Sequence, residues 1–327
     1  MSRRAPEDVT HVAVIGAGWI GGGWAAHFLR QGYTVSAWDP APDGPARLDA
    51  ILNIAWPSLE ALGFAEGASR EKLRFTSSLA DAVAGAEFIQ ESAPEDREIK
   101  TRLLGEIAAA ADPEAPIASS TAAMGMSTLD SQSVHPERLV VGHPFLPVYL
   151  LPIVEVVGSP RTDPAVIDWV VRLYEACGKT PIRMEREVTG FIGNRLQTAI
   201  TSEIMHMLAE NEATVEEIDL AVTTGPGLRW AFMGPLWTMY LASGWSGATW
   251  LPDESASHWD SSGESRCSGP AWTPELREKV LAGYERMLAG RSVEELMLWR
   301  DRNLIGVMAA IQQPPSMGGS ANTLKTD

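Results

Sequence analysis

Two side chains in the middle of the chain, a histidine and a glutamate, have positions that suit proton transfer. His143 follows the apolar run 139–142, so we expect it at the carboxyl end of a buried strand, where ligands bind in open α/β sheets. Glu155 lies within the apolar run 152–157, and a carboxylate buried among aliphatic side chains needs a partner. An imidazole accepts a hydroxyl proton near neutral pH, and a carboxylate stabilises the resulting imidazolium. The pair therefore predicts a general base; the alternative is a structural histidine.

A glycine-rich segment near the amino terminus predicts a dinucleotide site. Gly16, Gly18 and Gly21 follow the apolar run 11–15 and open a stretch with helical spacing. Glycine is needed because the backbone must turn sharply and approach a pyrophosphate, which the amides of the helix N-terminus then bind. About 20 residues further on, Asp39 ends the next expected strand, where a carboxylate accepts hydrogen bonds from ribose hydroxyls. Its charge would repel a 2′-phosphate, so NAD is expected rather than NADP.

The elements that must position these residues alternate between strand and helix in the first half of the chain. This alternation predicts an α/β fold with an N-terminal Rossmann-type domain, whose mostly parallel sheet is covered on both faces. The expected strands are 11–15, 34–38, 88–90, 116–119, 139–141, 153–157 and 180–183. Expected helices between them include 20–31, 96–111 and 164–177.

After about residue 187 the pattern becomes helical, which predicts a smaller all-α domain. Helices are expected at 191–210, 215–223, 274–289 and 293–312. We therefore predict an NAD-binding domain at 1–187, a helical domain for substrate binding and dimerisation at 188–313, and a disordered tail at 314–327. The segment 244–272, rich in Ser, Gly, Trp and Asp, is expected to be a long loop.

The composition narrows the classes of partner. Lys and Arg number 26 and Asp and Glu number 42, which gives a net charge of −16 and argues against nucleic acid or an anionic membrane. The two cysteines, Cys177 and Cys267, form no CxxC pair, so no metal and no dithiol chemistry is expected. The polar N-terminus and the lack of a membrane-length apolar run predict a cytoplasmic protein.

Several motifs in the same order resemble those of the 3-hydroxyacyl-CoA dehydrogenase family. Besides the opening fingerprint, they are QESAPE at 90–95, GHPFLPVYLLPIVE at 142–155, GFIGNR at 190–195 and GLRWAFMGP at 227–235. The resemblance covers roughly residues 10–240 and extends more loosely to about 312. It is strongest to the branch that contains L-carnitine 3-dehydrogenase and lambda-crystallin.

This resemblance implies an NAD-dependent enzyme that oxidises the 3-hydroxyl of a small free hydroxy acid, carnitine-like or gulonate-like, to the 3-keto acid. It also implies a homodimer formed through the helical domain. The dyad of the family falls on His143 and Glu155, and its substrate-contacting catalytic asparagine falls on Asn194. The implied cofactor contacts are Gly16, Gly18, Ile20, Gly21, Asp39, Glu95 and Lys100.

Two positions depart from the family pattern. Ala122 stands where the family has a serine that contacts the substrate oxygen, although Ser119, Ser120 and Thr121 precede it directly. Leu146 stands where the family's HxFNP motif has an asparagine. Each hydrogen bond lost in this way is worth about 1 kcal/mol or more. The departures predict an unusual substrate or diminished catalysis, with Ser119 and Ala122 as candidate substrate contacts.

Aromatic and basic side chains in the second half give two open interpretations of substrate binding. Arg229 could pair with a substrate carboxylate through two parallel hydrogen bonds, or form an internal pair. Tryptophans in the helical domain could form an aromatic cage for a quaternary ammonium group, or fill the core and a dimer interface. They are Trp230, Trp237, Trp245, Trp250, Trp259 and Trp272.

Three alternative functions remain open from the sequence. The departures at Ala122 and Leu146 allow a dinucleotide-binding protein with diminished or no dehydrogenase activity. A 3-hydroxyacyl-CoA dehydrogenase acting on a thioester is the second, although the net negative charge disfavours a polyanionic substrate. The third is the 6-phosphogluconate-like 3-hydroxyacid dehydrogenases, which share the fingerprint but use a lysine, and the expected helix 191–210 contains none.

Overall fold

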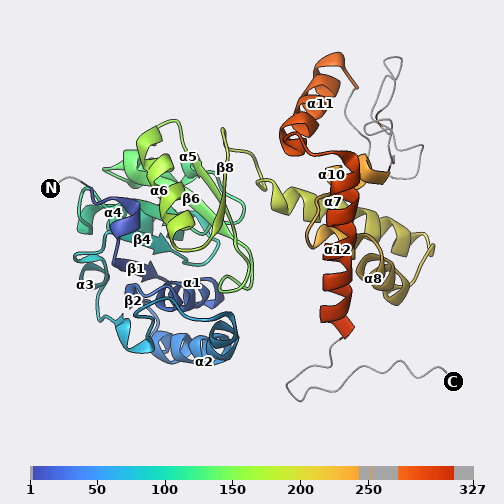
Figure 1. Ribbon diagram of the computed structural model, residues 1–327. Helices are drawn as coiled ribbons and strands as arrows, with labels where there is room; N and C mark the ends of the chain where they lie inside the picture. Colours follow the sequence, from blue (N-terminus) through green and yellow to red (C-terminus); the bar gives the residue numbers. More distant parts are fainter. Residues whose placement is uncertain (1–2, 243–250, 252–271, 313–327) are drawn as a thin grey trace. The chain divides into compact units, whose positions relative to one another are not determined.

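A computed structural model of the chain describes residues 3–242, 251 and 272–312. The predicted loop at 244–272 falls outside these residues except at Leu251 and Trp272, and the predicted tail at 314–327 falls outside them entirely. The chain divides into two compact units, Met1–Leu196 and Gln197–Asp327, each of which is described by itself (Figure 1).

The first unit is built on one eight-stranded sheet with the strand order β3-β2-β1-β4-β5-β6-β7-β8. All neighbouring strands pair in parallel except β6 and β7, so the predicted mostly parallel sheet is confirmed. The strands are β1 (His11–Ile15), β2 (Thr34–Trp38), β3 (Leu73–Phe75), β4 (Phe88–Glu91), β5 (Ile117–Ser119), β6 (Leu139–Pro144), β7 (Ile153–Gly158) and β8 (Thr180–Arg183).

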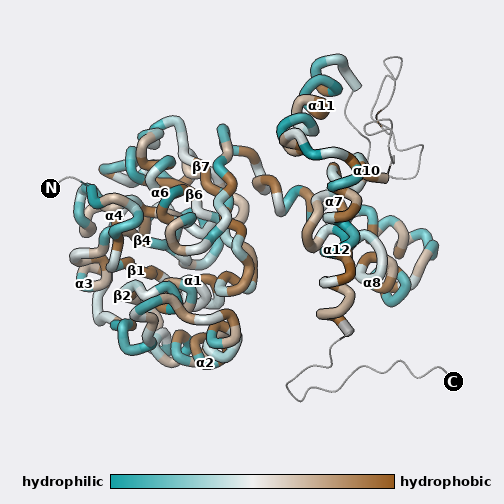
Figure 2. Tube along the Cα trace, viewed as in Figure 1, coloured by the Kyte–Doolittle hydropathy of each residue, from teal (hydrophilic) through white to brown (hydrophobic). Residues whose placement is uncertain are grey.

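Helices cover both faces of this sheet, because successive side chains of each strand point to opposite faces. In β1, Val12 and Val14 belong to the core that packs under α1, α2 and α6, whereas Ala13 and Ile15 belong to the core under α3, α4 and α5. Figure 2 shows β1 among the strongly hydrophobic segments of this unit. The helices are α1 (Trp19–Arg30), α2 (Gly44–Leu62), α3 (Leu79–Val83), α4 (Arg97–Ala110), α5 (Met126–Leu129) and α6 (Pro164–Ala176), with 3-10 turns at Pro6–Asp8, Arg70–Lys72, Asp130–Gln132 and Pro136–Arg138.

Local capping sets where several of these helices begin. The Asp96 carboxylate accepts a hydrogen bond from Ile99 N (2.9 Å) and caps α4, while the Ser78 hydroxyl caps α3. At α6, Asp163 accepts from Ala165 N (2.9 Å) and Pro164 occupies the first helical position, where no N–H is needed. These caps fix the loops that lead from the strand ends into the helices.

The connection between β6 and β7 is held in place by a buried lysine. Lys179 Nζ donates hydrogen bonds to the carbonyl oxygens of Val148 and Leu151, the latter at 2.9 Å. The ammonium also lies 5.1 Å from the ring centre of Trp24. Burial lowers the pKa of Lys179 to about 8. Because the connection leads directly from His143, this lysine helps to fix the end of β6.

The described part of the second unit is helical, which confirms the predicted helical C-terminal domain. Its helices are α7 (Gly193–Ala209, which begins in the first unit), α8 (Val215–Thr224), α9 (Pro226–Trp230), α10 (Pro235–Ala242), α11 (Pro274–Leu288) and α12 (Val293–Gln312). A small core forms around Met233, Leu241 and Leu296. Trp237 packs against this core and meets Tyr240 edge-on at 5.6 Å. Among the described residues no helix is long and apolar enough to cross a membrane.

Candidate active site

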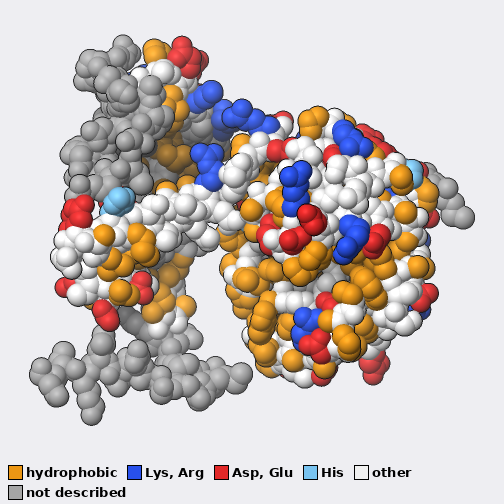
Figure 3. All heavy atoms as spheres, turned by 180° about the vertical axis from the view of Figure 1, so that it is seen from behind, with side chains coloured by type: hydrophobic (Ala, Val, Ile, Leu, Met, Phe, Trp, Pro, Cys, Tyr) orange, Lys and Arg blue, Asp and Glu red, His pale blue; other side chains and the backbone are white. Residues whose placement is uncertain are grey.

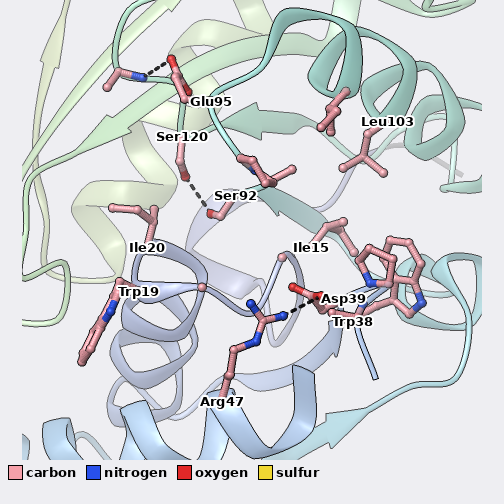
Figure 4. Close-up of a pocket in the computed structure, with 18 of the residues that line it drawn as sticks. Ile15, Trp19, Ile20, Trp38, Asp39, Arg47, Ser92, Glu95, Leu103 and Ser120 are labelled. Carbon is pink, nitrogen blue, oxygen red and sulfur yellow. Dashed lines mark hydrogen bonds and ion pairs between the residues drawn. The ribbon is translucent and has the colours of Figure 1, made fainter. Parts of the chain in front are cut away.

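A cavity of about 690 Å³ lies in the first unit at the edge where the parallel strands end (Figure 4). Its lining comes from the turn after β1, from Asp39 after β2, from the segment 92–95 after β4, from Ser120 and Ala122 after β5, and from His143 at the end of β6. Ligands bind at this edge in open α/β sheets, because helix N-termini and loops converge there. The structure thus places the predicted dinucleotide turn and the predicted base on one cavity.

The turn after β1 has room only for glycine at two of its positions. Gly16 has φ = 106°, which favours glycine, and a Cβ there would lie 2.5 Å from Ser92 O. A Cβ on Gly21 would lie 1.8 Å from Gly16 O. Gly18 is the N-cap of α1, and a Cβ there would meet no atom within 4 Å. The turn is therefore tight on its inner side and open towards the cavity, which fits a pyrophosphate at the helix N-terminus.

We expect Gly21→Ala to weaken NADH binding by about tenfold or more, because the added methyl group forces the turn away from the helix N-terminus that binds the phosphates. Fluorescence titration gives the dissociation constant, and circular dichroism reports whether the variant is folded. Gly283→Ala is the matched control, since a Cβ at Gly283 meets no atom within 4 Å. A folded Gly21→Ala protein that binds NADH like the wild type would contradict this account of the turn.

The Asp39 carboxylate is held at the rim of the cavity by three donors. Ala17 N donates to Oδ2 (2.7 Å), while Ala41 N and Arg47 Nη2 donate to Oδ1 (both 2.9 Å). Figure 4 shows Arg47 directed at Asp39 from α2. The bond from Ala17 ties the carboxylate to the glycine turn. The residues present therefore fit a dinucleotide, with the turn for its phosphates and Asp39 for a ribose.

Glu95 and Asn194 both hold the backbone turn that follows β5. Glu95 Oε1 accepts hydrogen bonds from Thr121 Oγ1 (2.5 Å), Ala122 N (3.0 Å) and Ala123 N (3.2 Å). Asn194 Nδ2 donates to Ala122 O (2.8 Å). Three of the predicted site residues, Glu95, Ala122 and Asn194, are thus brought together, and Glu95 and Ala122 also line the cavity.

Lys100 and Ser119 lie beneath the cavity and bind a carboxylate that the sequence analysis did not identify. Lys100 Nζ donates to Glu91 Oε1 (2.9 Å) and Oε2 (3.2 Å), and the Ser119 hydroxyl donates to Oε2. The Glu91, Lys100 and Ser119 side chains are all buried. Lys100 also lies 3.8 Å from Glu95 Oε2. Lys100 was predicted as a cofactor contact and Ser119 as a substrate contact, and these contacts stay predictions. The structure shows that both side chains hold the buried Glu91 carboxylate.

His143 and Glu155 face each other across the antiparallel pair of β6 and β7. They are direct partners in the strand register, and His143 Nδ1 donates to Glu155 Oε2 at 2.8 Å. The other carboxylate oxygen, Oε1, accepts from Ile192 N (2.8 Å) and Gly193 N (2.9 Å). Since Nδ1 is engaged, Nε2 is the imidazole nitrogen that is able to accept a proton from a ligand in the cavity.

The charge of Glu155 is stabilised although the side chain is fully buried. Burial by itself would raise the pKa of this carboxyl, but the hydrogen bond from His143 and those from the Gly193 and Ile192 amides outweigh it and lower the pKa below the ordinary value of 4.5. The carboxylate is therefore ionised at neutral pH. An ionised carboxylate only accepts hydrogen bonds, so the His143 proton must sit on Nδ1.

Aromatic rings fix the orientation of the imidazole. The ring centres of Phe145 and Phe191 lie 5.0 Å and 5.2 Å from that of His143. Phe191 has φ = 49°, an uncommon conformation for a bulky residue, in the segment that leads to the amides bound by Glu155. A Cβ at Gly193 would lie 2.3 Å from Phe145. The segment 191–193 therefore packs closely on the dyad.

Two serines on the cavity wall were missed as a pair by the sequence analysis. Ser120 Oγ lies 2.9 Å from Ser92 Oγ and accepts from Gln90 Nε2 (2.8 Å) and Trp24 Nε1 (3.2 Å). Tyr174 OH donates to Gln90 Oε1 (2.6 Å), which fixes the direction of the amide. With two donors directed at Ser120, its proton is left for Ser92 or for a ligand. The signals in the sequence were Ser92 within the QESAPE motif at 90–95 and Ser120 beside Ser119, and no spacing connects the two positions.

The remaining predicted site residues lie at three places. Ile20 is on α1 and lines the cavity. Arg229 and Trp230 are on α9 in the second unit, and their contact with substrate stays a prediction. The Leu146 side chain is exposed. Trp245, Trp250 and Trp259 fall outside the described residues.

Comparison with known families identifies both halves of the chain. Residues 11–188 match the model described as "3-hydroxyacyl-CoA dehydrogenase, NAD binding domain", and residues 190–283 match "3-hydroxyacyl-CoA dehydrogenase, C-terminal domain". Similar proteins include several that are named L-carnitine dehydrogenase. That of Nocardiopsis dassonvillei is 52% identical over 315 residues, covering 95% of this chain and 94% of the relative. That of Pseudomonas aeruginosa is 41% identical over 326 residues, covering 96% and 98%.

Solved structures of related dehydrogenases share the fold. One is 5-formyl-3-hydroxy-2-methylpyridine 4-carboxylic acid 5-dehydrogenase, described as an NAD⁺-dependent dismutase, with a TM-score of 0.69 and 27% identity over 93% of this chain and 99% of that one. Another is 3-hydroxybutyryl-CoA dehydrogenase from Escherichia coli K12, with a TM-score of 0.61 and 29% identity over 72% of this chain and 50% of that one.

Proposed function

The chain belongs to the 3-hydroxyacyl-CoA dehydrogenase family, and from that premise we propose that it oxidises the 3-hydroxyl of a small free hydroxy acid, with L-carnitine as the first candidate. It is an NAD-dependent oxidoreductase, as its family and relatives indicate. Relatives named for L-carnitine match nearly their whole length, which favours this substrate. The observation that carries the proposal is the hydrogen-bonded His143–Glu155 pair, with His143 on the wall of the cavity that the dinucleotide turn also lines.

The reaction assigns a separate task to each part of the cavity. When bound, NAD would supply the acceptor for the hydride that leaves C3 of the substrate. The amides at the start of α1 would bind the phosphates and Asp39 a ribose. His143 Nε2 takes the hydroxyl proton as the oxygen becomes a carbonyl. Nδ1–H keeps donating its hydrogen bond to Glu155, whose charge stabilises the imidazolium. Glu155 acts through His143 and is a positioning residue.

The surrounding residues support these positions. We assign Lys100 and Ser119 to holding Glu91, and Glu95 and Asn194 to shaping the turn that carries Ala122. Asn194 also remains the proposed substrate contact. Ala122 has no hydroxyl to offer the substrate, and the Ser92–Ser120 pair provides hydroxyl groups on the same wall.

Glu155→Gln is expected to lower the rate of NADH formation by on the order of 10²–10⁴-fold. The amide oxygen would keep the bonds from Ile192 N and Gly193 N, which turns the amide NH₂ towards His143 Nδ1. His143 would then carry its proton on Nε2 and lose its ability to act as a base. Steady-state absorbance measurements test this, with Glu155→Asp as the conservative comparison that retains the charge. Full activity in Glu155→Gln would contradict the role of the carboxylate.

The same variant tests how the contribution of Glu155 to the unfolding free energy depends on pH. Because the folded pKa of Glu155 is lowered, the stability that its charge contributes is present above the ordinary value of 4.5 and is lost as the pH falls through the lowered value. The difference in unfolding free energy between wild type and Glu155→Gln is therefore expected to shrink on acidification. Urea unfolding at neutral and acidic pH measures it, and a difference that grows in acid would contradict the stated cause.

The substrate class is tested by offering the wild type NAD with L-carnitine, gulonate, 3-hydroxybutyrate and 3-hydroxybutyryl-CoA, and following NADH absorbance. We expect the highest kcat/KM with a free hydroxy acid, and L-carnitine to exceed the others. A preference for 3-hydroxybutyryl-CoA would favour the thioester alternative instead. Binding of NADH without turnover of any of the four would overturn the proposed substrate class.

We also propose that the protein forms a homodimer through its second unit. The domain boundary at 187/188 likewise stays a proposal. Large apolar side chains are exposed along α12, where Leu298, Ile305 and Met308 recur at helical spacing. On the face drawn in Figure 3, the first unit carries basic and acidic side chains beside one another, with hydrophobic side chains among them. Light scattering is expected to give about twice the chain mass of 35.3 kDa, and a mass of one chain would contradict the dimer.

A further inference from the structure

An arginine at the rim of the cavity is positioned to bind a phosphate but is occupied by carboxylates. Arg47 Nη2 lies 2.9 Å from Asp39 Oδ1, and its Nε lies 3.4 Å from Asp43 Oδ2. Both Asp39 and Arg47 line the cavity, and Figure 4 shows the guanidinium and the carboxylate in contact there. The Asp39 side chain is 12% exposed and that of Arg47 43%, so the pair lies between protein and cavity.

The charges at this point are unfavourable for a 2′-phosphate. One guanidinium stands between two carboxylates, which leaves a net charge of −1 on the group. A 2′-phosphate on the ribose would bring further negative charge close to Asp39, and its natural partner, Arg47, already donates to that carboxylate. This effect therefore depends on Asp39 in two ways, since this residue both repels the phosphate and engages the arginine.

We infer that Arg47 is a latent phosphate-binding group of the cofactor site, which Asp39 keeps occupied in the wild type. A guanidinium binds phosphate through two parallel hydrogen bonds, and an arginine near the end of the second strand suits the 2′-phosphate of NADP. Removing the charge at Asp39 releases Arg47 into the cavity rim, so that one substitution creates a site for NADP. Asp43 competes weakly for the released guanidinium, because its side chain is 67% exposed and its charge is screened by water.

This inference rests on the proposed placement of a ribose at Asp39 and is independent of the proposed substrate. Its test is therefore a binding measurement that needs no turnover. Trp19 and Trp38 line the cavity, so energy transfer from tryptophan to the reduced nicotinamide reports binding of NADH and NADPH. Dissociation constants for both are measured with the wild type, Arg47→Leu, Asp39→Asn, and the double variant Asp39→Asn/Arg47→Leu.

The wild type and Arg47→Leu are expected to prefer NADH. In Asp39→Asn the ratio of the NADPH to the NADH dissociation constant is expected to fall by roughly 10- to 100-fold, the range of one or two charge-assisted hydrogen bonds. The double variant is expected to lose the part of this gain that the Arg47 guanidinium contributes and to keep only the part that comes from removing the repulsion by Asp39. Asp39→Asn/Arg172→Leu is the matched control, because it removes the same charge from an exposed arginine that pairs with Glu7, and it is expected to keep the gain.

Two results would overturn the inference. One is an Asp39→Asn protein with no gain in NADPH binding, and the other is an equal gain with and without Arg47. Asp39→Ser is measured beside Asp39→Asn, so that a folded variant decides the matter if one of them fails to fold. Failure of the wild type to bind NADH would contradict the placement of the cofactor itself, whereas failure to oxidise L-carnitine leaves these binding results standing.

Discussion

Replacing His143 with alanine is expected to lower the rate of NADH formation by about 10²–10⁴-fold while NADH binding is unchanged. The loss follows because the imidazole is the group on the cavity wall whose protonation is set by a buried carboxylate, with Nδ1 held at 2.8 Å by Glu155 and Nε2 left to take the proton. The dinucleotide turn and Asp39 lie on other strands and keep their bonds in the variant. Absorbance and fluorescence titration separate the two effects.

Two further measurements distinguish loss of the base from general damage. Added imidazole is expected to restore part of the activity of His143→Ala, because the substitution leaves a space the size of the missing ring between Phe145 and Phe191. His135→Ala is the control histidine, since His135 is paired with Glu137 in an exposed segment. Wild-type activity in His143→Ala would contradict the role of His143 as the general base.

The second large effect is on stability. Lys100→Met is expected to destabilise the folded protein by about 3–5 kcal/mol, because it leaves the Glu91 carboxylate buried without its cation. The Lys100 and Glu91 side chains are 1% and 0% exposed, so water does not replace the lost charge. Ala93 N (2.6 Å) and the Ser119 hydroxyl still donate to Glu91, but neither carries a charge. Urea unfolding with linear extrapolation measures the loss.

A double variant tests whether the unpaired charge is the cause. Lys100→Met/Glu91→Gln removes the charge and keeps an oxygen for Ala93 N, so it is expected to recover part of the lost stability. Arg172→Leu breaks the exposed pair with Glu7 and is expected to leave the unfolding free energy nearly unchanged, because water screens both charges. If Lys100→Met were as mild as Arg172→Leu, the buried pair would not support the floor of the site.

Much of the first unit could be predicted from local patterns. The strands at 11–15 and 34–38 have the predicted bounds, because short apolar runs that end at a glycine turn or an acid leave little choice of structure. β3 (Leu73–Phe75) was not predicted, since it has three residues and one of them, Arg74, is exposed. Its position is set by pairing with β2, which a local pattern does not reveal.

The arrangement of the site was harder to predict from the sequence, because it depends on contacts between strands. Sequence patterns placed His143 at a strand end and Glu155 inside a strand, but the antiparallel register that makes them direct partners follows from the path of the chain between β6 and β7. Lys100 shows the same limit. Its spacing from Leu103, Leu104 and Ile107 places Lys100 on the buried face of α4, but this spacing does not show which carboxylate pairs with the ammonium there, Glu91 at the end of β4.

The departure at Ala122 also has a structural context. The backbone of Ala122 is hydrogen-bonded on both sides. Its N–H donates to Glu95 and its carbonyl oxygen accepts from Asn194. The turn therefore keeps its position without the hydroxyl, and the loss concerns only what the side chain offers to the substrate. The Ser92–Ser120 pair shows that the wall of the cavity is polar next to this position.

The most direct test of the account is the oxidation of L-carnitine that carries deuterium at C3, with the mass of the NADH measured after turnover by the wild type and by His143→Ala. The proposed reaction predicts that wild-type NADH carries the deuterium and that His143→Ala forms little NADH of either mass. NADH without deuterium would show that the C3–H bond is not the one broken, and labelled NADH formed at the wild-type rate by His143→Ala would contradict the assigned base.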